Sequence, residues 1–398
     1  METEAAPGPQ NAPATPTKEP TKPDSAVAPE QPAPRNQARP GRLVSLDALR
    51  GLAIALMLLV NNTAVDTATP PQLTHAPWNG GIRMADLVFP WFLFCVGAAI
   101  PFASAAFHRK NLPAWRYDLK AATRAALLVL LGCLLDSSLA KRPILDLGVL
   151  QIIGLAYLVG ALLYGIRISR RMLVVGVLLG AYWAVIRFLP VPGAGVGIFE
   201  ERQNAILHIN LTYLARYNLS GLLSVVPTSA MVLIGTAVGD ALRRTDVGHS
   251  WKASCLALTG VALMLGGALW NLSLPFNKPV WTPSYILFTA GLGSLALGLF
   301  YLLIDIKGWR SWAFPLVVFG SNAILAYVAP ILVKVHILQE WMVHVGASNT
   351  VTAQQWYLDL WVAHAGRIPG GWIYTATYIL VWWLILWVLY RRKLFLRV

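Results

Sequence analysis

The sequence alternates between long apolar stretches and shorter polar or basic ones from Leu46 to the C-terminus. A helix needs roughly 17 to 25 apolar residues to cross a hydrocarbon core about 30 Å thick. Stretches of this kind recur at 46–64, 84–106, 119–136, 145–165, 172–190, 221–242, 253–272, 282–304, 313–335 and 372–390. We therefore predict an all-α fold, a polytopic integral membrane helix bundle of about ten transmembrane helices, with an eleventh left open.

Composition indicates the same class of protein. Hydrophobic residues make up 56% of the 398-residue chain and charged residues 13%, and the mean hydropathy is +0.56. Soluble globular proteins are much less apolar than this. The net charge of +14 suits attraction to anionic membrane lipid, so we expect lipid around the protein and no nucleic-acid partner.

The first part of the chain has a different composition. Residues 1–41 are rich in Pro, Ala, Thr and Glu and have no apolar run able to bury surface. They also lack the basic segment followed by an apolar segment that marks a secretory signal. We predict a disordered, cytoplasmic Pro/Ala-rich tail at 1–41 and a transmembrane domain at 42–398.

Basic residues gather in every second connection between the predicted spans. They include Arg109, Lys110, Arg116, Arg167, Arg170, Arg171, Arg243, Arg244, Lys252, Lys307, Arg310 and the Arg391–Lys393 run. The positive-inside rule places these connections and both termini in the cytoplasm. His75 then faces the external side, and a bacterial inner membrane is the location that we predict.

The stretch Thr74–Gly97 carries the densest candidate chemistry. It holds His75, Trp78, Asn79 and Asp86 where a polar loop opens into an apolar helix. Polar groups are costly at the mouth of a span, so such a cluster indicates a function, although a lone loop histidine is most often a surface residue. Asp86 is placed to orient the imidazole for general-base or nucleophilic work. No second His or Cys lies at ligand spacing, so we expect no metal.

Other polar residues at span ends have structural and functional interpretations that the sequence leaves open. Asp47 and Arg50 share one helix face, as a helix-entry pair or as a site for an anionic ligand. Asn61 and Asn62 end the first span, where they cap carbonyls or line a pocket. Amides within spans often only bond neighbouring helices. The remaining candidate residues at or near span ends or within spans are Gln151, Lys278, Trp281 and Asn322.

Several of these segments together resemble one family. HAPWNGGIRMADLVFPWFLFCVGAAI at 75–100 closely resembles the signature of the heparan-α-glucosaminide N-acetyltransferase family. SLDALRGLAIALMLLVNN, GVLQIIGLAY, GLLSVVPTSAMVLIGTAVGD, FNKPVWTPSYILFTAG and FGSNAILAYV agree in the same order. The resemblance covers residues 42 to about 335.

The resemblance implies a membrane acyltransferase that moves an acetyl group from cytoplasmic acetyl-CoA to the amine of glucosamine or a related amino sugar across the membrane. It implies His75 as general base or transient acetyl carrier, with Asn61 and Asp86 as the other catalytic residues. The implied substrate-binding residues are Asn62, Trp78, Asn79, Gln151, Lys278, Trp281 and Asn322. Asp47 and Arg50 are implied for acetyl-CoA, and a homodimer stays open.

The chain departs from the family pattern at two places. Ile152 stands where family members often have arginine, and Asn218, Leu219 and Ser220 stand where they often have Asp-Pro-Glu. Two other functions stay open beside N-acetyl transfer. One is transport of a small polar solute, and the other is O-acyl transfer to a cell-envelope glycan.

Overall fold

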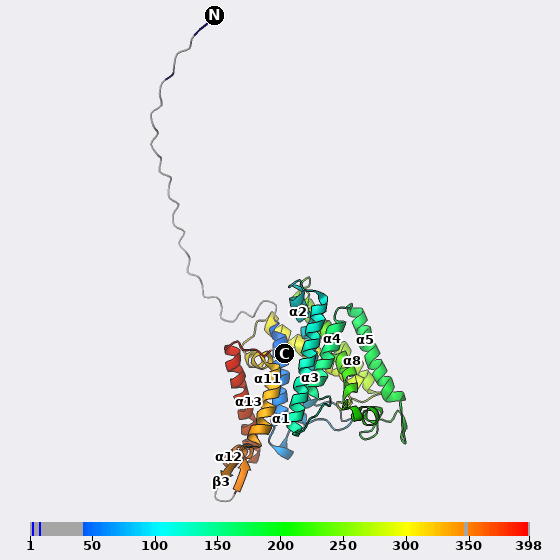
Figure 1. Ribbon diagram of the computed structural model, residues 1–398, viewed down its shortest axis with the longest axis vertical. Coiled ribbons are helices and arrows are strands. Elements are labelled where there is room, and N and C mark those ends of the chain that lie inside the picture. Colours follow the sequence, from blue (N-terminus) through cyan, green and yellow to red (C-terminus); the bar gives the residue numbers. More distant parts are fainter. Residues whose placement is uncertain (1, 4–7, 9–42, 346–348, 397–398) are drawn as a thin grey trace. The chain divides into compact units, whose positions relative to one another are not determined.

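The computed structural model describes residues 2–3, 8, 43–345 and 349–396 of the chain (Figure 1). The tail predicted at 1–41 lies outside the described residues, apart from those three. The transmembrane domain belongs to a single compact unit that runs from Gly41 to Val398. The prediction of an all-α membrane bundle is confirmed, because helices dominate the described residues of this unit and eight of them are long and apolar enough to cross a membrane.

The helices follow one another with short connections at one end and longer connections at the other. They are α1 (Val44–Asn62), α2 (Met84–His108), α3 (Ala114–Ala140), α4 (Val149–Leu163), α5 (Ile168–Phe188), α6 (Ala205–Ile209), α7 (Val225–Arg243), α8 (His249–Asn271), α9 (Pro283–Phe300), α10 (Phe314–Ser321), α11 (Ala323–Val333), α12 (Ala353–Ala365) and α13 (Arg367–Arg391). π-Helical turns extend α9 over Tyr301–Ile306 and α11 over Lys334–Leu338.

Strands are few and lie in the longer connections. β1 (Pro190–Val191) pairs antiparallel with β2 (Gly195–Val196), and β3 (Met342–Val345) pairs antiparallel with β4 (Asn349–Thr352). The β3–β4 hairpin precedes α12, and both lie beyond the lower end of α13 in Figure 1.

Each of the ten apolar stretches contains a helix, but not every helix is a full span. Within the described residues, eight helices are long and apolar enough to cross a membrane, and a bent pair raises the number to 9. α4 is also apolar but has only 15 residues. The apolar stretch 313–335 forms a bent pair of helices and not a single straight one, because α10 and α11 meet at an angle of 78°.

Asn322 explains this bend. Its backbone leaves the helical region, with φ −127° and ψ 48°, and its side chain bonds main-chain groups of the C-terminal segment. The amide Nδ2 donates to the Leu394 carbonyl at 3.0 Å, and Oδ1 accepts from the Leu396 N–H at 2.8 Å. A side chain that bonds the backbone of another segment in this way stabilises a break that hydropathy does not reveal.

Close helix contacts hold the bundle together. α2 and α7 approach through Gly97, where an added Cβ would lie 2.1 Å from the Val232 carbonyl oxygen. α1 and α10 approach through Gly51 and Gly320, and a Cβ on Gly320 would lie 2.1 Å from the Asp47 carbonyl oxygen. Such glycine contacts are typical of membrane helices, which gain little from hydrophobic association. The faces of α3, α5, α8 and α13 that point away from the bundle carry exposed leucines and valines instead of close glycine contacts.

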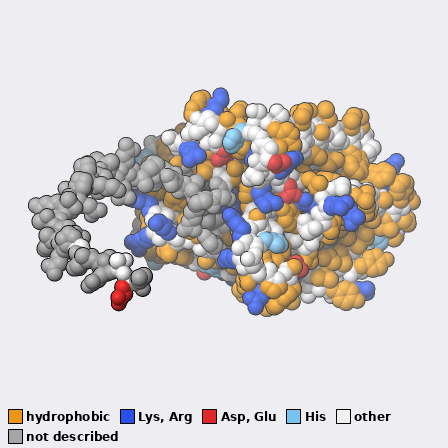
Figure 2. Space-filling view, turned by 90° about the horizontal axis from the view of Figure 1, so that it is seen from above, with side chains coloured by type: hydrophobic (Ala, Val, Ile, Leu, Met, Phe, Trp, Pro, Cys, Tyr) orange, Lys and Arg blue, Asp and Glu red, His pale blue; other side chains and the backbone are white. Residues whose placement is uncertain are grey.

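The alternating direction of the helices gives the bundle two ends. We call the end where α1 begins the Arg50 end, and the opposite end, where α1 ends and α2 begins, the His75 end. Figure 2 looks onto the Arg50 end and shows Lys and Arg side chains spread over it among hydrophobic ones. The longer connections, 63–83, 189–224, 272–282 and the one between α11 and α13, belong to the His75 end.

Candidate active site

The N-terminus of α2 fixes a carboxylate against the imidazole of His75. Asp86 lies in the first turn, where backbone N–H groups have no partner within the helix. Its Oδ2 accepts from the N–H groups of Arg83 and Ala76, both at 3.1 Å. Its Oδ1 lies 2.9 Å from Nδ1 of His75. The Asp86 side chain is 2% exposed and that of His75 is 58% exposed, so a buried anchor holds an accessible ring.

This contact sets the tautomer of a neutral His75. A carboxylate only accepts hydrogen bonds, so the proton of the ring belongs on Nδ1, which faces Asp86. The lone pair is then on Nε2. A ring in this state accepts a proton at Nε2, and the carboxylate stabilises the imidazolium that forms.

Lys278 adds a cation to this pair from a connection 203 residues away in sequence. Its Nζ lies 3.0 Å from Nδ1 and 3.3 Å from Nε2 of His75, and 3.6 Å from Oδ1 of Asp86. Burial lowers the pKa of the Lys278 ammonium, and the nearby Asp86 carboxylate opposes that shift. The structure therefore brings His75, Asp86 and Lys278 into one cluster.

Two aromatic residues predicted for the site lie on the two loops that carry His75 and Lys278. Trp78 packs on Phe199 with ring centroids 5.1 Å apart and donates to the Phe199 carbonyl at 3.3 Å. Trp281 is buried, and its ring meets that of Phe89 edge-on at 5.1 Å. Tyr285, one helical turn further on, donates its hydroxyl to the backbone carbonyl of Asp86 at 2.5 Å.

Asn79 joins the same two connections as Lys278. Its backbone is left-handed, with φ 55°, a conformation that asparagine tolerates better than most residues. Its Oδ1 accepts from Nδ2 of Asn277 at 3.3 Å. The Asn79–Asn277 contact thus ties the loop that carries His75 to the loop that carries Lys278.

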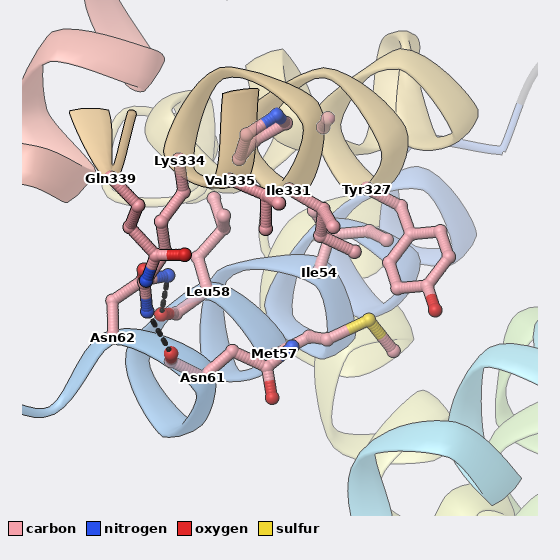
Figure 3. Close-up of a pocket in the computed structure, with 12 residues that line it drawn as sticks. Ile54, Met57, Leu58, Asn61, Asn62, Tyr327, Ile331, Lys334, Val335 and Gln339 are labelled. Atoms are coloured by element: carbon pink, nitrogen blue, oxygen red, sulfur yellow. Dashed lines mark hydrogen bonds between the residues drawn. The ribbon is translucent and has the colours of Figure 1, made fainter. Parts of the chain in front are cut away.

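The two asparagines at the end of α1 line a different feature, a pocket of about 400 Å³ between α1 and α11 (Figure 3). Lys334 reaches across its polar end and donates to the Asn61 carbonyl at 3.0 Å. Asn62 donates from Nδ2 to the Leu58 carbonyl at 2.8 Å, while its buried Oδ1 has no hydrogen-bond partner among the described residues. The rest of the lining is mostly apolar, from residues such as Ile54, Met57, Tyr327 and Ile331. Among the described residues, no hydrogen bond joins Asn61 to His75.

Gln151 belongs to a third location at the His75 end. It is fully buried at the start of α4 and donates from Nε2 to Oδ2 of Asp136 on α3 at 2.8 Å. Asp136 borders a hollow of about 680 Å³, together with Asp146, Ser220 and Gly221 among others. Ser220 is the last residue of the segment 218–220 that departs from the family pattern, so one end of this departure borders the hollow.

The remaining candidates lie at the Arg50 end. Arg50 pairs with Asp47 at 2.8 Å, and its Nε donates to the Gly320 carbonyl at 2.9 Å. Asn322 follows Gly320 by two residues and bonds the C-terminal segment. The structure therefore does not bring Asn322 to the His75 cluster, and the role of Asp47 and Arg50 toward acetyl-CoA stays a prediction.

The sequence reasoning missed two charged residues that the structure places in the cavities. Asp136 and Lys334 both lie near the ends of apolar stretches, where a charge is ordinarily read as the edge of a span. The only signal in the sequence was their occurrence within otherwise apolar runs. Among the described residues, no group of three or more His, Cys, Asp or Glu side chains lies close enough to hold a metal ion.

The fold and the cluster define a polytopic membrane protein in which a loop histidine contacts a buried carboxylate. A protein-family model described as "Heparan-alpha-glucosaminide N-acetyltransferase, catalytic" matches residues 42–269, more than half of the chain. The chain belongs to this family.

Two curated relatives carry the name heparan-alpha-glucosaminide N-acetyltransferase. The human protein is 26% identical over 445 aligned positions, which cover 95% of this chain and 63% of the human one. The mouse protein is 24% identical and is covered over 64% of its length. The chain thus spans less than two thirds of each relative.

Proposed function

We propose that the protein is a membrane-bound N-acetyltransferase that moves an acetyl group from acetyl-CoA to the amine of glucosamine or a related amino sugar. The observation that carries this proposal is the contact of His75 with the buried Asp86 carboxylate, in a chain of an N-acetyltransferase family. The pair supplies a positioned base, and an amine acceptor needs one.

The need for a base follows from the acceptor. An amino-sugar amine is protonated in much of its population near neutral pH and must lose a proton before it attacks a thioester. Nε2 of His75 takes that proton, while Asp86 holds the ring and stabilises the imidazolium. The amine nitrogen then bonds the acetyl carbon, the carbon–sulfur bond breaks, and CoA leaves as the thiol. In the alternative route, Nε2 itself takes the acetyl group first and passes it to the amine.

The α1–α11 pocket supports a place for the donor. Its apolar lining suits a pantetheine arm, and its polar end carries the Asn61 side chain (Figure 3). An amide N–H there is suited to donate to the thioester oxygen, on which negative charge develops in the transition state. By the positive-inside rule, the Arg50 end with its basic connections faces the cytoplasm, where acetyl-CoA is found, and His75 faces the external side.

The test is transfer by the purified full-length protein in detergent or proteoliposomes. Acetyl-CoA and glucosamine are supplied, and N-acetylglucosamine and free CoA thiol are measured. His75→Gln keeps a polar side chain of similar length but removes the base, so we expect transfer to fall by about 100-fold or more. His344→Gln, at an exposed histidine of β3, is the matched control and keeps wild-type transfer. A His75→Gln protein that transfers like the control would overturn the assignment of His75.

A further inference from the structure

We infer that Lys278 is an internal acceptor, an amine that becomes acetylated on Nζ in a His75-dependent reaction when the acyl donor is bound and no external amine is present. This inference rests on the proposed function and adds a modification site to it. It also predicts that an amino-sugar acceptor protects Lys278, because both amines use the same base.

The first argument is the position of the amine. Nζ of Lys278 lies within 3.3 Å of both ring nitrogens of His75. Nζ lies somewhat nearer to Nδ1 than to Nε2. With Nδ1 protonated toward Asp86, Nε2 is the ring nitrogen that can accept from the Lys278 ammonium, and its lone pair is the one that the mechanism requires. An external amine that gives its proton to Nε2 has to occupy the place of this ammonium.

The second argument is that the backbone of Lys278 is held in place. The neighbouring Asn277 accepts from the N–H of Val280 at 3.0 Å, and its own N–H donates to Thr282 at 3.0 Å. These bonds close the turn around the lysine, and the Asn277 contact to Asn79 links it to the His75 loop. Only the side chain of Lys278 is left to move, so the amine stays near the imidazole unless another group displaces it.

Two other lysines at the His75 end provide internal comparisons. Lys334 lies beside Asn61 in the α1–α11 pocket but donates to a backbone carbonyl, and among the described residues no hydrogen bond joins it to an imidazole. Lys141 is 69% exposed and pairs with Glu340 at 2.8 Å. The burial that lowers the pKa of Lys278 also increases its neutral, nucleophilic fraction. Of these three lysines, Lys278 alone combines an adjacent imidazole with a lowered pKa.

The chemistry balances with an acyl-CoA as the co-reactant. The ammonium gives one proton to Nε2 of His75, and the neutral Nζ attacks the thioester carbonyl carbon. A nitrogen–carbon bond forms and the carbon–sulfur bond breaks. The second proton lost from nitrogen goes to the CoA thiolate, and the first leaves His75 to solvent. The product is an amide, which does not pass its acetyl group onward, so this reaction is a dead end rather than a carrier step.

This dead end bears on how the mechanism is studied. Acetyl label retained on the protein in the absence of acceptor is the usual sign of an acyl-enzyme intermediate. An acetyl-imidazole on His75 is cleaved by hydroxylamine, whereas an acetyl amide on Lys278 survives. Hydroxylamine-resistant label is therefore label on an amine such as Lys278 and is no evidence for a two-step mechanism.

The experiment incubates the full-length protein with isotope-labelled acetyl-CoA without acceptor, then digests it and quantifies label at Lys278, Lys334 and Lys141 by mass spectrometry. We expect Lys278 to be labelled fastest, and glucosamine to suppress that labelling but not the labelling of Lys141. In His75→Gln we expect the Lys278 rate to fall by about 100-fold, the typical contribution of a positioned base. The Lys141 rate stays unchanged and shows that the variant meets the donor equally, while a size-exclusion profile like that of the wild-type protein shows that the variant is folded.

The outcomes separate this inference from the proposed function. If glucosamine is acetylated but Lys278 is labelled no faster than Lys141, or equally in His75→Gln, the inference is wrong and the proposed function stands. If neither glucosamine nor Lys278 is acetylated by acetyl-CoA, the proposed function fails and the inference fails with it. Hydroxylamine-labile label on the His75 peptide alone would assign the retained acetyl group to His75 and also overturn the inference.

Discussion

Replacing Asp86 by asparagine tests the tautomer argument most directly, because the two side chains have the same shape. In the protein, Oδ2 accepts from two backbone N–H groups, and Oδ1 faces Nδ1 of His75. An amide has only one acceptor oxygen. Its oxygen satisfies the two N–H groups of Arg83 and Ala76, which leaves the NH₂ group toward His75. The ring must then accept at Nδ1 and carry its proton on Nε2.

The cost of that change follows from what it removes. With Nε2 protonated, the ring has no lone pair for the acceptor ammonium, and no carboxylate stabilises an imidazolium. Loss of a general base costs about 100- to 10,000-fold in rate, or roughly 3 to 5 kcal/mol of transition-state stabilisation. The folded state loses one charge-assisted hydrogen bond, about 1–3 kcal/mol. We therefore expect Asp86→Asn to remain folded and to lose nearly all transfer.

The assay compares Asp86→Asn with Asp66→Asn. Asp66 lies at the same end and pairs with Arg367 in an exposed contact. Exposed ion pairs contribute little, so this control keeps both its activity and its thermal unfolding temperature near wild type. N-acetylglucosamine formation is measured for both, with size-exclusion profiles as the check on folding. A folded Asp86→Asn protein with transfer within threefold of the control would refute the argument that Asp86 sets the tautomer of His75.

Three further substitutions test the fold and the charge of the site. Gly320→Ala forces a Cβ against the Asp47 carbonyl and should cost about 1–3 kcal/mol, seen as a lower unfolding temperature in detergent; an unchanged temperature contradicts the tight α1–α10 contact. Asn322→Ala removes both bonds to the C-terminal segment and should make limited trypsin digestion after Lys393 faster. The lowered pKa of Lys278 means that the unfolded state binds its proton more tightly. Stability therefore rises with pH between that lowered pKa and the ordinary value of about 10.4. Lys278→Met should flatten this rise in a thermal unfolding series, and an equally steep rise would contradict it.

The helices were predictable because a membrane helix must bury its backbone polar groups within itself and present apolar side chains to lipid. Each span therefore appears in the sequence as a long local run of apolar residues, as α2 and α7 illustrate. The α10–α11 bend was not predictable, since Asn322 is a single amide in an apolar run. Its partners, Leu394 and Leu396, lie more than 70 residues away, and no local pattern encodes them.

The candidate site likewise contains one contact that could be predicted from the sequence and one that could not. His75 and Asp86 are 11 residues apart, on a loop and on the helix that follows it, so their contact was predictable from the sequence. Lys278 comes from a connection that only the packing of α9 against α2 brings near. The family resemblance pointed to Lys278 without giving its partner. Its contact with both ring nitrogens required the three-dimensional arrangement.

Asn61 and Asn62 show how tertiary packing decides between interpretations that a sequence leaves equal. The sequence offered capping or pocket lining for both residues. In the structure, the Asn62 amide caps the Leu58 carbonyl, and its backbone carbonyl accepts from Thr375 of α13 at 3.0 Å. Asn61 has no such bond from its side chain among the described residues and faces the α1–α11 pocket. Both asparagines line the α1–α11 pocket, but the carbonyl of Asn62 also fastens α1 to α13, whereas the side chain of Asn61 is left to meet a ligand.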